Sequence, residues 1–492
     1  MTNARAASAA WGRSSDRKDN TAPLLGVPEE LAPGLDVVRR LRDAGYEAYL
    51  VGGVVRDLLL GRVPHDLDIV TSAQPDVISE LFSKTVQTGA EFGVVTVVAD
   101  GQPFQVATFR REGPYLDGRR PAYVEYADLR EDVLRRDFTV NALVYDPIAD
   151  RVLDFVGGRA DLEHRVLRTI GDPTARFGED RLRLLRAVRF ATELRFTVEP
   201  ATLEAIRELA PTIVGVSAER IRDEVLRLLR APDRAGGVRL LHSSRLLTVI
   251  LPEVARMDGV PQPPEFHPEG DVLTHTCLAL QHLTDPTPVL AMATLLHDVG
   301  KPLTLTVADR IRFHGHADVG AQMAEEICRR LRMPVADTRA IVTLVSEHLK
   351  IGDVRDMRPA KAMRLLRRPD IDDLLELHRV DCLASHGDLR IYDWAVTARR
   401  AIESAGPPPP RLVTGDDLIA LGYAPGPRFA EMLEAADIAQ AEGEIQSAAD
   451  GRAWVLARFP AGGGSRRVEA PSSADHDRRD DPPEGGGQHV GT

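Results

Sequence analysis

Two aspartates, Asp66 and Asp68, stand two residues apart and follow a glycine pair at Gly52 and Gly53. Residues i and i+2 of a β-strand point to the same face, so the two carboxylates are expected to project together. Two carboxylates on one face, with other positions left to water and phosphate oxygens, form a ligand set that suits Mg²⁺. Two such ions can activate a hydroxyl nucleophile and stabilise a leaving pyrophosphate. An isolated Asp-x-Asp pair is usually a solvated strand end, so the prediction depends on the combination with the glycines.

The glycine pair is expected at a turn between a strand and a helix. An apolar run at 46–51 precedes it, and the helical run VVRDLLLG follows it. Because glycine has no Cβ atom, the backbone can approach a phosphate closely, and the N–H groups of the helix start favour that anion. The order and spacing of these residues therefore predict a phosphate and metal site at the end of a strand.

A third pattern, EDRLRLLR at 179–186, could read a nucleotide base. Asp180, Arg183 and Arg186 are spaced i, i+3, i+6, so we expect them on one helix face. A carboxylate accepts a hydrogen bond from an exocyclic amino group, while a guanidinium donates to a ring nitrogen. Cytosine and adenine present that edge, whereas guanine and uracil present a carbonyl and a ring N–H. An Asp/Arg pair could therefore accept CTP and ATP and reject GTP and UTP; in isolation, the same spacing would be a surface salt bridge.

Together with RRDFTVNAL at 135–143 and SAERIRDE at 217–224, these motifs resemble the class II tRNA CCA-adding enzymes and bacterial poly(A) polymerases of the polymerase beta-like nucleotidyltransferase superfamily. The match is collinear over roughly residues 35–250. The resemblance implies transfer of nucleotides from CTP and ATP to the 3′ end of a tRNA, with Mg²⁺ held by the catalytic residues Asp66 and Asp68. The nucleotide-binding residues that it implies are Gly52, Gly53, Arg56, Asp57, Arg136, Asp137, Asn141, Asp180, Arg183 and Arg186.

One position departs from this family. Its members often carry a third carboxylate on a later strand, but the corresponding run here, FQVAT at 104–108, offers Gln105. Either Asp137 or another acid assists the metal, or two carboxylates suffice. The third ligand therefore stays unassigned.

Histidines and aspartates recur in the second half of the chain in the order H…HD…H…H…D, on expected helices. Imidazoles suit transition metals, and aspartate can complete or bridge the coordination sphere. The pattern resembles the HD phosphohydrolase superfamily, which implies one or two divalent metals of unknown identity and a phosphatase or phosphodiesterase activity; a metal kept only for structure is the alternative. His267, His282, His314 and His386 have no matching role. The implied ligands are His275, His297, Asp298, His316, His348 and Asp381.

The elements around these motifs predict an α+β chain: a polymerase beta-like nucleotidyltransferase α/β head, an all-helical neck or body, and an all-helical HD domain. Strand and helix patterns alternate up to about residue 170, helical periodicity follows, and Pro-rich breaks occur at 260–270 and 406–410. The expected parts are a disordered tail (1–30), the head (31–170), a helical neck that binds RNA and nucleotide (171–258), the HD domain (259–405), a C-terminal helical segment that resembles an RNA-holding piece (406–460) and a disordered tail (461–492).

Composition limits the remaining possibilities. The 492 residues are 43% hydrophobic and 28% charged, which excludes a fibrous or wholly disordered chain. No apolar run is long enough for a membrane span, and the N-terminus lacks the apolar core of a secretory signal, so we expect a cytoplasmic protein without a membrane partner. The three cysteines are far apart, which argues against a disulfide framework and a thiolate zinc site.

The charge distribution is uneven. The net charge is −12, yet residues 151–250 contain 18 Arg, no Lys and 14 Asp or Glu. This local excess is typical of a phosphate-backbone contact surface, although the preference of the whole chain for Arg over Lys is also what a GC-rich genome produces.

Several functions remain open at this point. Within the family, poly(A) addition or partial CC or A addition competes with CCA addition. From another class, the chain could be an HD phosphohydrolase whose head only binds RNA, or an RNA-binding scaffold. The sequence makes no prediction of the oligomeric state.

Overall fold

The computed structural model describes residues 27–460 except 65, 88–92, 114–122, 266 and 407–408. Apart from residues 27–30, the expected tails at 1–30 and 461–492 lie outside these described residues. The chain divides into two compact units, residues 1–357 with 364–404 and residues 358–363 with 405–492. Among the described residues, no helix is long and apolar enough to cross a lipid bilayer.

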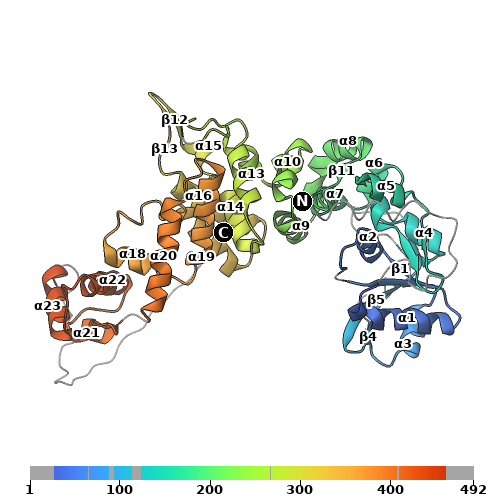
Figure 1. Ribbon diagram of the computed structural model, residues 1–492, viewed down its shortest axis with the longest axis horizontal. Coiled ribbons are helices and arrows are strands. Elements are labelled where there is room, and N and C mark those ends of the chain that lie inside the picture. Colours follow the sequence, from blue (N-terminus) through green and yellow to red (C-terminus); the bar gives the residue numbers. More distant parts are fainter. Residues whose placement is uncertain are drawn as a thin grey trace, which may run out of the picture. The chain divides into compact units, whose positions relative to one another are not determined.

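The N-terminal part of the first unit is built on a mixed seven-stranded sheet with the order β3-β4-β5-β2-β1-β8-β9 (Figure 1). Only β2 and β5 pair in parallel; the other neighbours in this sheet are antiparallel. The strands are β1 (Ala48–Val51), β2 (Asp68–Thr71), β3 (Thr85–Val86), β4 (Val94–Ala99), β5 (Gln102–Thr108), β8 (Val144–Asp146) and β9 (Arg151–Leu153). The associated helices are α1 (Ala32–Asp43), α2 (Gly53–Leu59), α3 (Pro75–Leu81) and α4 (Leu129–Leu134).

The sequence dictates two features of this sheet. Positive φ angles at Asp100 (48°) and Gly101 (81°) make the tight turn that joins β4 to β5, as expected for a two-residue hairpin. One face of the sheet packs on a core of Tyr49, Val70 and Phe109, with neighbouring apolar side chains. A separate antiparallel hairpin pairs β6 (Arg110–Glu112) with β7 (Val124–Tyr126).

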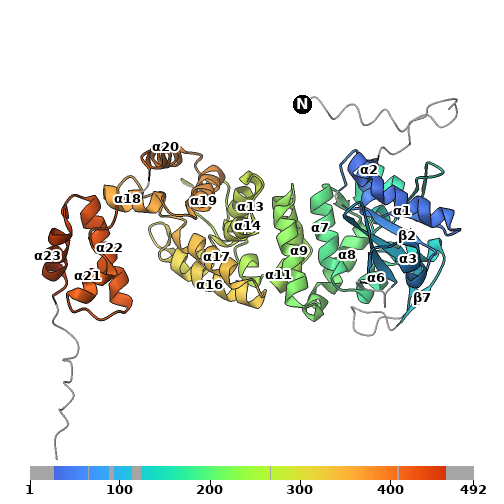
Figure 2. The same cartoon turned by 90° about the horizontal axis from the view of Figure 1, so that it is seen from below.

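Helices follow the sheet, as the periodicity predicted. They are α5 (Gly158–His164), α6 (Pro173–Glu179), α7 (Arg183–Leu194), α8 (Pro200–Leu209), α9 (Ala218–Arg230), α10 (Arg234–Ser243), α11 (Leu246–Ile250) and α12 (Pro252–Ala255). Two short parallel strands, β10 (Val166–Leu167) and β11 (Thr197–Val198), lie among them. Figure 2 shows α7, α8 and α9 beside the sheet-containing part of this unit.

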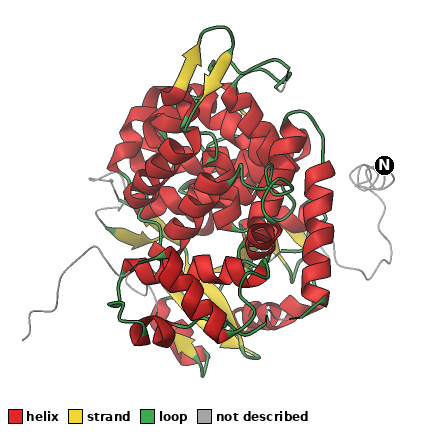
Figure 3. Ribbon diagram, turned by 90° about the vertical axis from the view of Figure 1, so that its left-hand side faces the viewer, coloured by secondary structure: helices red, strands yellow, loops and turns green. Residues whose placement is uncertain are grey.

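A second group of helices completes the first unit. It consists of α13 (Val272–His282), α14 (Pro288–Leu296), α15 (Lys301–Thr304), α16 (His316–Arg330), α17 (Val335–Glu347), α19 (Ile371–Ala384) and α20 (Arg390–Ser404), with part of α18 (Pro359–Leu366). A short hairpin of β12 (Leu305–Val307) and β13 (Ile311–Phe313) interrupts the helices; in Figure 3 it is the yellow pair that projects from the red helices. Helix α14 is almost wholly buried, which explains why its sequence is apolar on all sides.

The second unit has its own small core. Its helices are α21 (Gly415–Ala420), α22 (Pro427–Ala441) and α23 (Ala448–Arg458). Leu418, Met432 and Val455 meet in this core. Thr414 and Asp417 form a capping box at the start of α21. An α/β part followed by helical parts therefore agrees with the fold class expected from the sequence.

Candidate functional site

The glycine turn and Asp68 lie beside each other because β1 and β2 run antiparallel. In this register Leu50 pairs with Ile69, so the end of β1 meets the start of β2. Gly52 follows β1 with φ of +82°, in the region that favours glycine, and Gly53 begins α2. A Cβ atom on Gly52 would lie 3.9 Å from Asp68 Oδ2 and 3.5 Å from Arg136 Nη1. The expected strand–Gly-Gly–helix turn is therefore present and faces the aspartate.

Asp68 is the first residue of β2, whereas Asp66 precedes the strand, so the expectation that both carboxylates stand on one strand holds for Asp68 alone. Both residues are exposed to solvent. The pKa of Asp68 is raised, chiefly because surrounding protein displaces water; Arg136 opposes this shift and the Asp66 carboxylate adds to it. Two accessible carboxylates that repel each other are a donor set that a divalent cation would stabilise.

Gln105 occupies the neighbouring position on the parallel strand β5, where it pairs directly with Asp68. Partners in adjacent strands project to the same face of a sheet, and Gln105 is exposed like Asp68. An amide therefore stands where the family often has a third carboxylate. Asp68 and Gln105 thus offer side-chain oxygens on one face, the donor type that Mg²⁺ prefers.

Asp137 does not offer a free carboxylate to this set. Its Oδ2 accepts hydrogen bonds from Arg186 Nε at 3.0 Å and Nη2 at 2.6 Å. Its Oδ1 accepts hydrogen bonds from Asn141 Nδ2 at 3.2 Å and from the Phe138 amide at 2.8 Å. Burial favours the neutral acid, but the charge and hydrogen bonds of Arg186 outweigh it and lower the pKa of Asp137. Asp137 is thus an ionised anchor between two motifs.

The same network continues to the helix behind the glycine turn. Arg56 Nη1 donates to Asn141 Oδ1 at 2.6 Å, and Arg56 Nε and Nη2 donate to the Asp57 carboxylate at 2.8 and 3.0 Å. Helix α2, the 3-10 turn η4 (Thr139–Asn141) and α7 are therefore tied together by side chains predicted to bind nucleotide. In this arrangement Asp57 orients Arg56.

Arg136 is positioned by a residue that sequence reasoning missed. Asp132, which is fully buried, accepts from Arg136 Nη2 at 3.1 Å and from Arg135 Nη2 at 2.7 Å. The i, i+3 and i, i+4 spacing of these residues was the available signal. Arg136 Nε is buried and has no hydrogen-bond partner within the described part of the chain. A guanidinium with a spare donor, beside Gly52 and Asp68, suits a phosphate oxygen.

The base-reading motif is arranged differently from the expectation of one helix face. Helix α6 ends at Glu179 and α7 begins at Arg183, so Asp180 lies in the junction between them. Asp180 Oδ1 accepts from the Leu182 amide at 3.0 Å, and this local bond competes with helical bonding. Only Arg183 and Arg186 of the three residues are therefore on a helix.

Asp180 and Arg183 also have separate partners in the structure. Arg220 Nη2 donates to Asp180 Oδ2 at 3.0 Å. Arg183 Nη1 donates to Glu179 Oε2 at 2.5 Å and to the Arg176 carbonyl at 3.0 Å, and Arg183 is only 8% exposed. In this conformation the two predicted base-reading side chains do not point outward as a pair.

The six side chains predicted from the HD pattern do converge. His275 Nε2 lies 3.0 Å from Asp381 Oδ1 and 3.3 Å from His297 Nε2. His316 Nε2 and His348 Nε2 lie 3.3 Å apart. These ligand atoms form two candidate metal-binding groups, one of His275, His297 and Asp381 and the other of Asp298, His316 and His348.

Asp298 connects the two groups. Its Oδ2 lies 3.3 Å from His297 Nε2, and its Oδ1 lies 3.5 Å from His316 Nε2. Asp298 is 2% exposed, and the ammonium of Lys301 lies 2.7 Å from its Oδ2. Burial favours protonation, but the charges of Lys301 and His297 lead the opposing effects that hold its pKa well below the usual range.

Hydrogen bonds orient the four imidazoles. The Nδ1 atoms of His297, His316 and His348 lie 2.7–2.8 Å from backbone carbonyls three residues earlier. A carbonyl only accepts, so each Nδ1 donates to it, and each Nε2 is the ring nitrogen that faces the centre and can bind a metal. Imidazole nitrogens with fixed tautomers and a buried bridging carboxylate fit one or two divalent transition metals.

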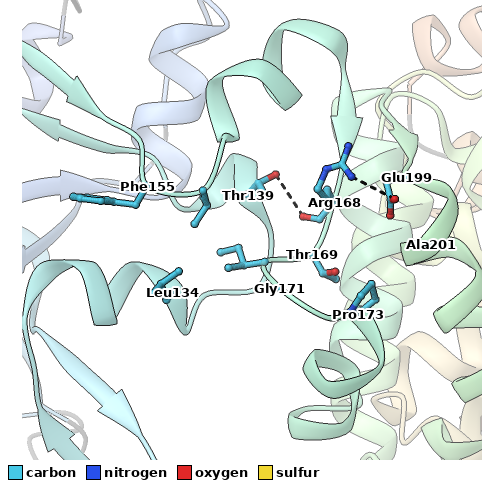
Figure 4. A pocket seen from close by; sticks show the side chains of 11 residues that line it. Leu134, Thr139, Phe155, Arg168, Thr169, Gly171, Pro173, Glu199 and Ala201 are labelled. Atoms are coloured by element: carbon cyan, nitrogen blue, oxygen red, sulfur yellow. Dashed lines mark hydrogen bonds and ion pairs between the residues drawn. The ribbon is translucent and has the colours of Figure 1, made fainter.

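A separate hollow of about 430 Å³ lies away from both groups (Figure 4). Thr139, Thr169 and Ile170 line it together with Glu199, the N-cap residue of α8, and Arg168 Nη1 lies 3.3 Å from Glu199 Oε1. The aspartates of the glycine turn and the histidines are not among its lining residues.

Three segments of the chain match family models. Residues 48–168 match the Poly A polymerase head domain, residues 195–257 match the model described as a probable RNA and SrmB-binding site of polymerase A, and residues 273–384 match the HD domain. The resemblance seen in the motifs is therefore confirmed for each of these segments.

Curated relatives and solved structures agree with these matches. The CCA-adding enzyme of Lactobacillus johnsonii is 46% identical over 207 residues, which is 42% of this chain and 52% of the relative. The enzyme of the same name from Streptococcus mutans is 43% identical over 223 residues, 45% of this chain and 55% of the relative. This chain thus spans about half the length of the curated relatives it matches.

The structural similarity covers more of the chain than the sequence matches do. The crystal structure of the Bacillus stearothermophilus CCA-adding enzyme in complex with CTP aligns with a TM-score of 0.65 and 27% identity, over 88% of this chain and 98% of that one. The Thermotoga maritima CCA-adding enzyme complexed with tRNA aligns with a TM-score of 0.53 and 19% identity, over 89% and 97%. The expected fold class is confirmed.

Proposed function

We propose that this chain, which carries a poly(A) polymerase head domain, the associated RNA-binding segment and an HD domain, is a template-independent RNA nucleotidyltransferase that adds CCA to the 3′ end of tRNA. The 3′-hydroxyl of the RNA attacks the α-phosphate of CTP or ATP, and pyrophosphate leaves. The observation that carries the proposal is the position of Asp68, with Asp66 beside it, against the glycine turn and the guanidinium of Arg136.

Asp66 and Asp68 would hold Mg²⁺, with the Gln105 amide as a further oxygen donor. Bound Mg²⁺ supplies activation of the attacking hydroxyl and charge neutralisation on the departing pyrophosphate. Arg136, whose Nη1 lies beside Gly52, would place its positive charge on the triphosphate. The chain contributes positioning and fixed charge rather than a protein nucleophile.

The remaining motif residues hold the nucleotide. Gly52 and Gly53 let the backbone approach the phosphates, and Arg56, kept in place by Asp57 and Asn141, adds positive charge. We assign ribose and phosphate positioning to Asn141 and to Asp137, which also fixes Arg186.

Base selection is assigned to Asp180 and Arg183. Arg183 would exchange its bond to Glu179 for the base, while the hydrogen bond from Arg220 holds Asp180 in place. The relative solved with CTP and the one solved with tRNA support cytidine nucleotides and tRNA as the substrates of this chain, and a further relative was solved with ATP.

The HD centre is proposed as a metal-dependent phosphohydrolase. The observation that supports this proposal is the convergence of four histidine Nε2 atoms on Asp298 and Asp381 inside a buried site. Divalent metals held there would supply a Lewis acid for phosphoester hydrolysis.

The domain limits and the cellular location belong to the same proposal. We place the head at 31–170, the neck at 171–258, the HD domain at 259–405 and an RNA-holding segment at 406–460. A cytoplasmic location fits an enzyme that acts on tRNA.

A sequenced nucleotide-addition assay tests the proposal. Transcripts that end before CCA, after C and after CC are incubated with CTP and ATP, and the products are sequenced. Completion to CCA from each transcript is the expected result. A homopolymeric A tail would identify a poly(A) polymerase. Products that stop after CC, or addition of A only to the transcript that already ends in CC, would identify a partial enzyme.

The two other functional classes have their own outcomes. Undiminished physiological activity after Asp66→Ala and Asp68→Ala would favour an HD phosphohydrolase with an RNA-binding head. Binding of tRNA without release of pyrophosphate would favour a scaffold.

A further inference from the structure

The Pro-rich segment 258–272 lies between two matched family segments, 195–257 and 273–384, and belongs to neither. Its composition predicts a boundary between domains. In the structure, the described part of this loop is fastened to the start of α13. Pro261 forms a β-bridge with Asp271, and the Val272 amide donates to the Val260 carbonyl at 3.1 Å. Gln262 is only 4% exposed. The loop is therefore packed against the start of α13, the helix that carries His275.

Glu269 of this loop reaches the metal-binding group. Its Oε1 lies 2.7 Å from His275 Nδ1 and 2.9 Å from His267 Nδ1, and its side chain is 7% exposed. His275 is fully buried, and its opposite nitrogen, Nε2, faces Asp381 and His297. A carboxylate bound to Nδ1 of a buried histidine fixes the ring and leaves Nε2 free as a ligand.

This support differs from that of the other three histidines. His297, His316 and His348 are each oriented by the backbone carbonyl three residues earlier in the chain. His275 depends instead on a side chain outside α13. Removing one side chain can therefore release His275, whereas no single side-chain change removes the support of the others.

We propose that Glu269 is a positioning residue of the HD centre, which holds His275 so that its Nε2 faces the divalent metal. The proposal depends on the metal-dependent function assigned to this centre. The loop makes a second contact of the same kind, because Gln262 Oε1 accepts from Lys301 Nζ at 2.6 Å, and Lys301 is paired with Asp298. Both ends of the loop thus reach residues that surround the candidate metals.

His267, Glu269 and His275 also satisfy the geometry of a third metal group. Ligands on a tetrahedral ion at about 2.1 Å stand roughly 3.4 Å apart. The Glu269 contacts of 2.7 and 2.9 Å are shorter and are hydrogen-bond lengths. A metal there would also require both nitrogens of His275 to act as ligands. The hydrogen-bonded arrangement is the better account.

The test is a titration of the full chain with Mn²⁺, followed by calorimetry, in a background with Asp66→Asn and Asp68→Asn so that the head does not bind. Glu269→Ala should weaken Mn²⁺ binding by about 10- to 100-fold. Glu269→Gln retains an acceptor and should restore part of the affinity. Glu265→Ala, an exposed glutamate in the same loop, is the matched control and should bind like the parent chain.

The possible outcomes separate this inference from its premise. If the parent chain binds Mn²⁺ and Glu269→Ala binds it with equal affinity, only the positioning role of Glu269 is overturned. Absence of Mn²⁺ binding in the parent chain would overturn the metal function and this inference with it. If Glu269→Ala does not fold, Glu269→Gln decides: wild-type affinity and a wild-type pH profile of binding contradict the proposal, and a weakened affinity supports it.

Discussion

Arg220 of α9 donates a hydrogen bond from Nη2 to the carboxylate of Asp180, with Oδ2 at 3.0 Å and Oδ1 at 3.4 Å. The two residues are 40 positions apart in the sequence, and their side chains are 28% and 19% exposed. The bond leaves acceptor positions of Asp180 available for the amino group of a base. A helix from the predicted RNA-binding neck thereby holds the residue that we assign to base selection.

Arg220→Ala should lower kcat/KM for CTP and ATP by about tenfold, because a hydrogen bond to a charged group contributes 1.5–3 kcal/mol and Asp180 would lose its orientation. The kcat/KM for UTP should change less, so the preference for CTP and ATP over UTP should become smaller. Steady-state kinetics with the four nucleotides measure both effects. Arg227→Ala, on an exposed position of the same helix, should keep the ratio of CTP to UTP, and an unchanged ratio in Arg220→Ala would contradict the role of the pair.

Gly52→Ala should reduce nucleotide addition beyond its effect on stability. Its φ of +82° costs an L-residue about 1–2 kcal/mol, and the added methyl group would stand between Arg136 and Asp68. Gly101→Ala is a matched control, because Gly101 has φ of +81° in the β4–β5 turn and open space around it. Urea unfolding should show similar losses in both variants, while only Gly52→Ala loses activity. Equal activity in the two would contradict the phosphate-binding role of the turn.

Asp137→Asn should lower the free energy of unfolding by about 1.5–3 kcal/mol at neutral pH, the contribution of a hydrogen bond to a charged group, because Arg186 would keep its charge without its partner. The pKa of Asp137 is lowered, so its stabilising effect is complete above its ordinary pKa and is lost as the pH falls through the lowered value. The difference between wild type and variant should therefore shrink below about pH 4.

Denaturant titrations at several pH values measure this difference. Asp223→Asn removes a pair with Arg222 in which Asp223 is 54% exposed, and it should change stability by at most about 0.5 kcal/mol. A difference for Asp137→Asn that persists unchanged at acidic pH would contradict the ionised Asp137–Arg186 pair.

The HD centre should bind two Mn²⁺ ions per chain when the head aspartates are replaced by asparagine. His316→Ala should leave one ion, because it removes a ligand from the group with Asp298 and His348 but none from the group with His275 and Asp381. His314→Ala, two residues away and exposed, should keep both. Metal analysis after dialysis gives the stoichiometry; two retained ions in His316→Ala would contradict the arrangement.

Local patterns predicted much of the head. The Gly-Gly turn depends on the backbone conformation of Gly52 and on the start of α2 at Gly53, so it requires no knowledge of distant residues. The order of histidines and aspartates in the second half of the chain predicted the six side chains that converge in the structure.

Partner choice was less predictable. Asp180 was expected on a helix, but its bond to the Leu182 amide starts a new helix at Arg183. Arg183 turns inward to Glu179, which a face-by-face reading does not reveal. Glu269 and His267 lie in a segment whose proline content indicates a linker, and their contact with His275 depends on how the loop folds back. Such pairings are decided by tertiary packing.

The central claim, that Asp68 and Asp66 hold the metal for nucleotide addition, is tested most directly by the rate of CMP incorporation into a tRNA that lacks CCA. The account predicts that Asp68→Asn lowers this rate by at least about 10³-fold, since several kcal/mol of charge stabilisation depend on the bound metal, while Asp298→Asn in the HD centre leaves it unchanged. A wild-type rate in Asp68→Asn, or an equal loss in both variants, would contradict it.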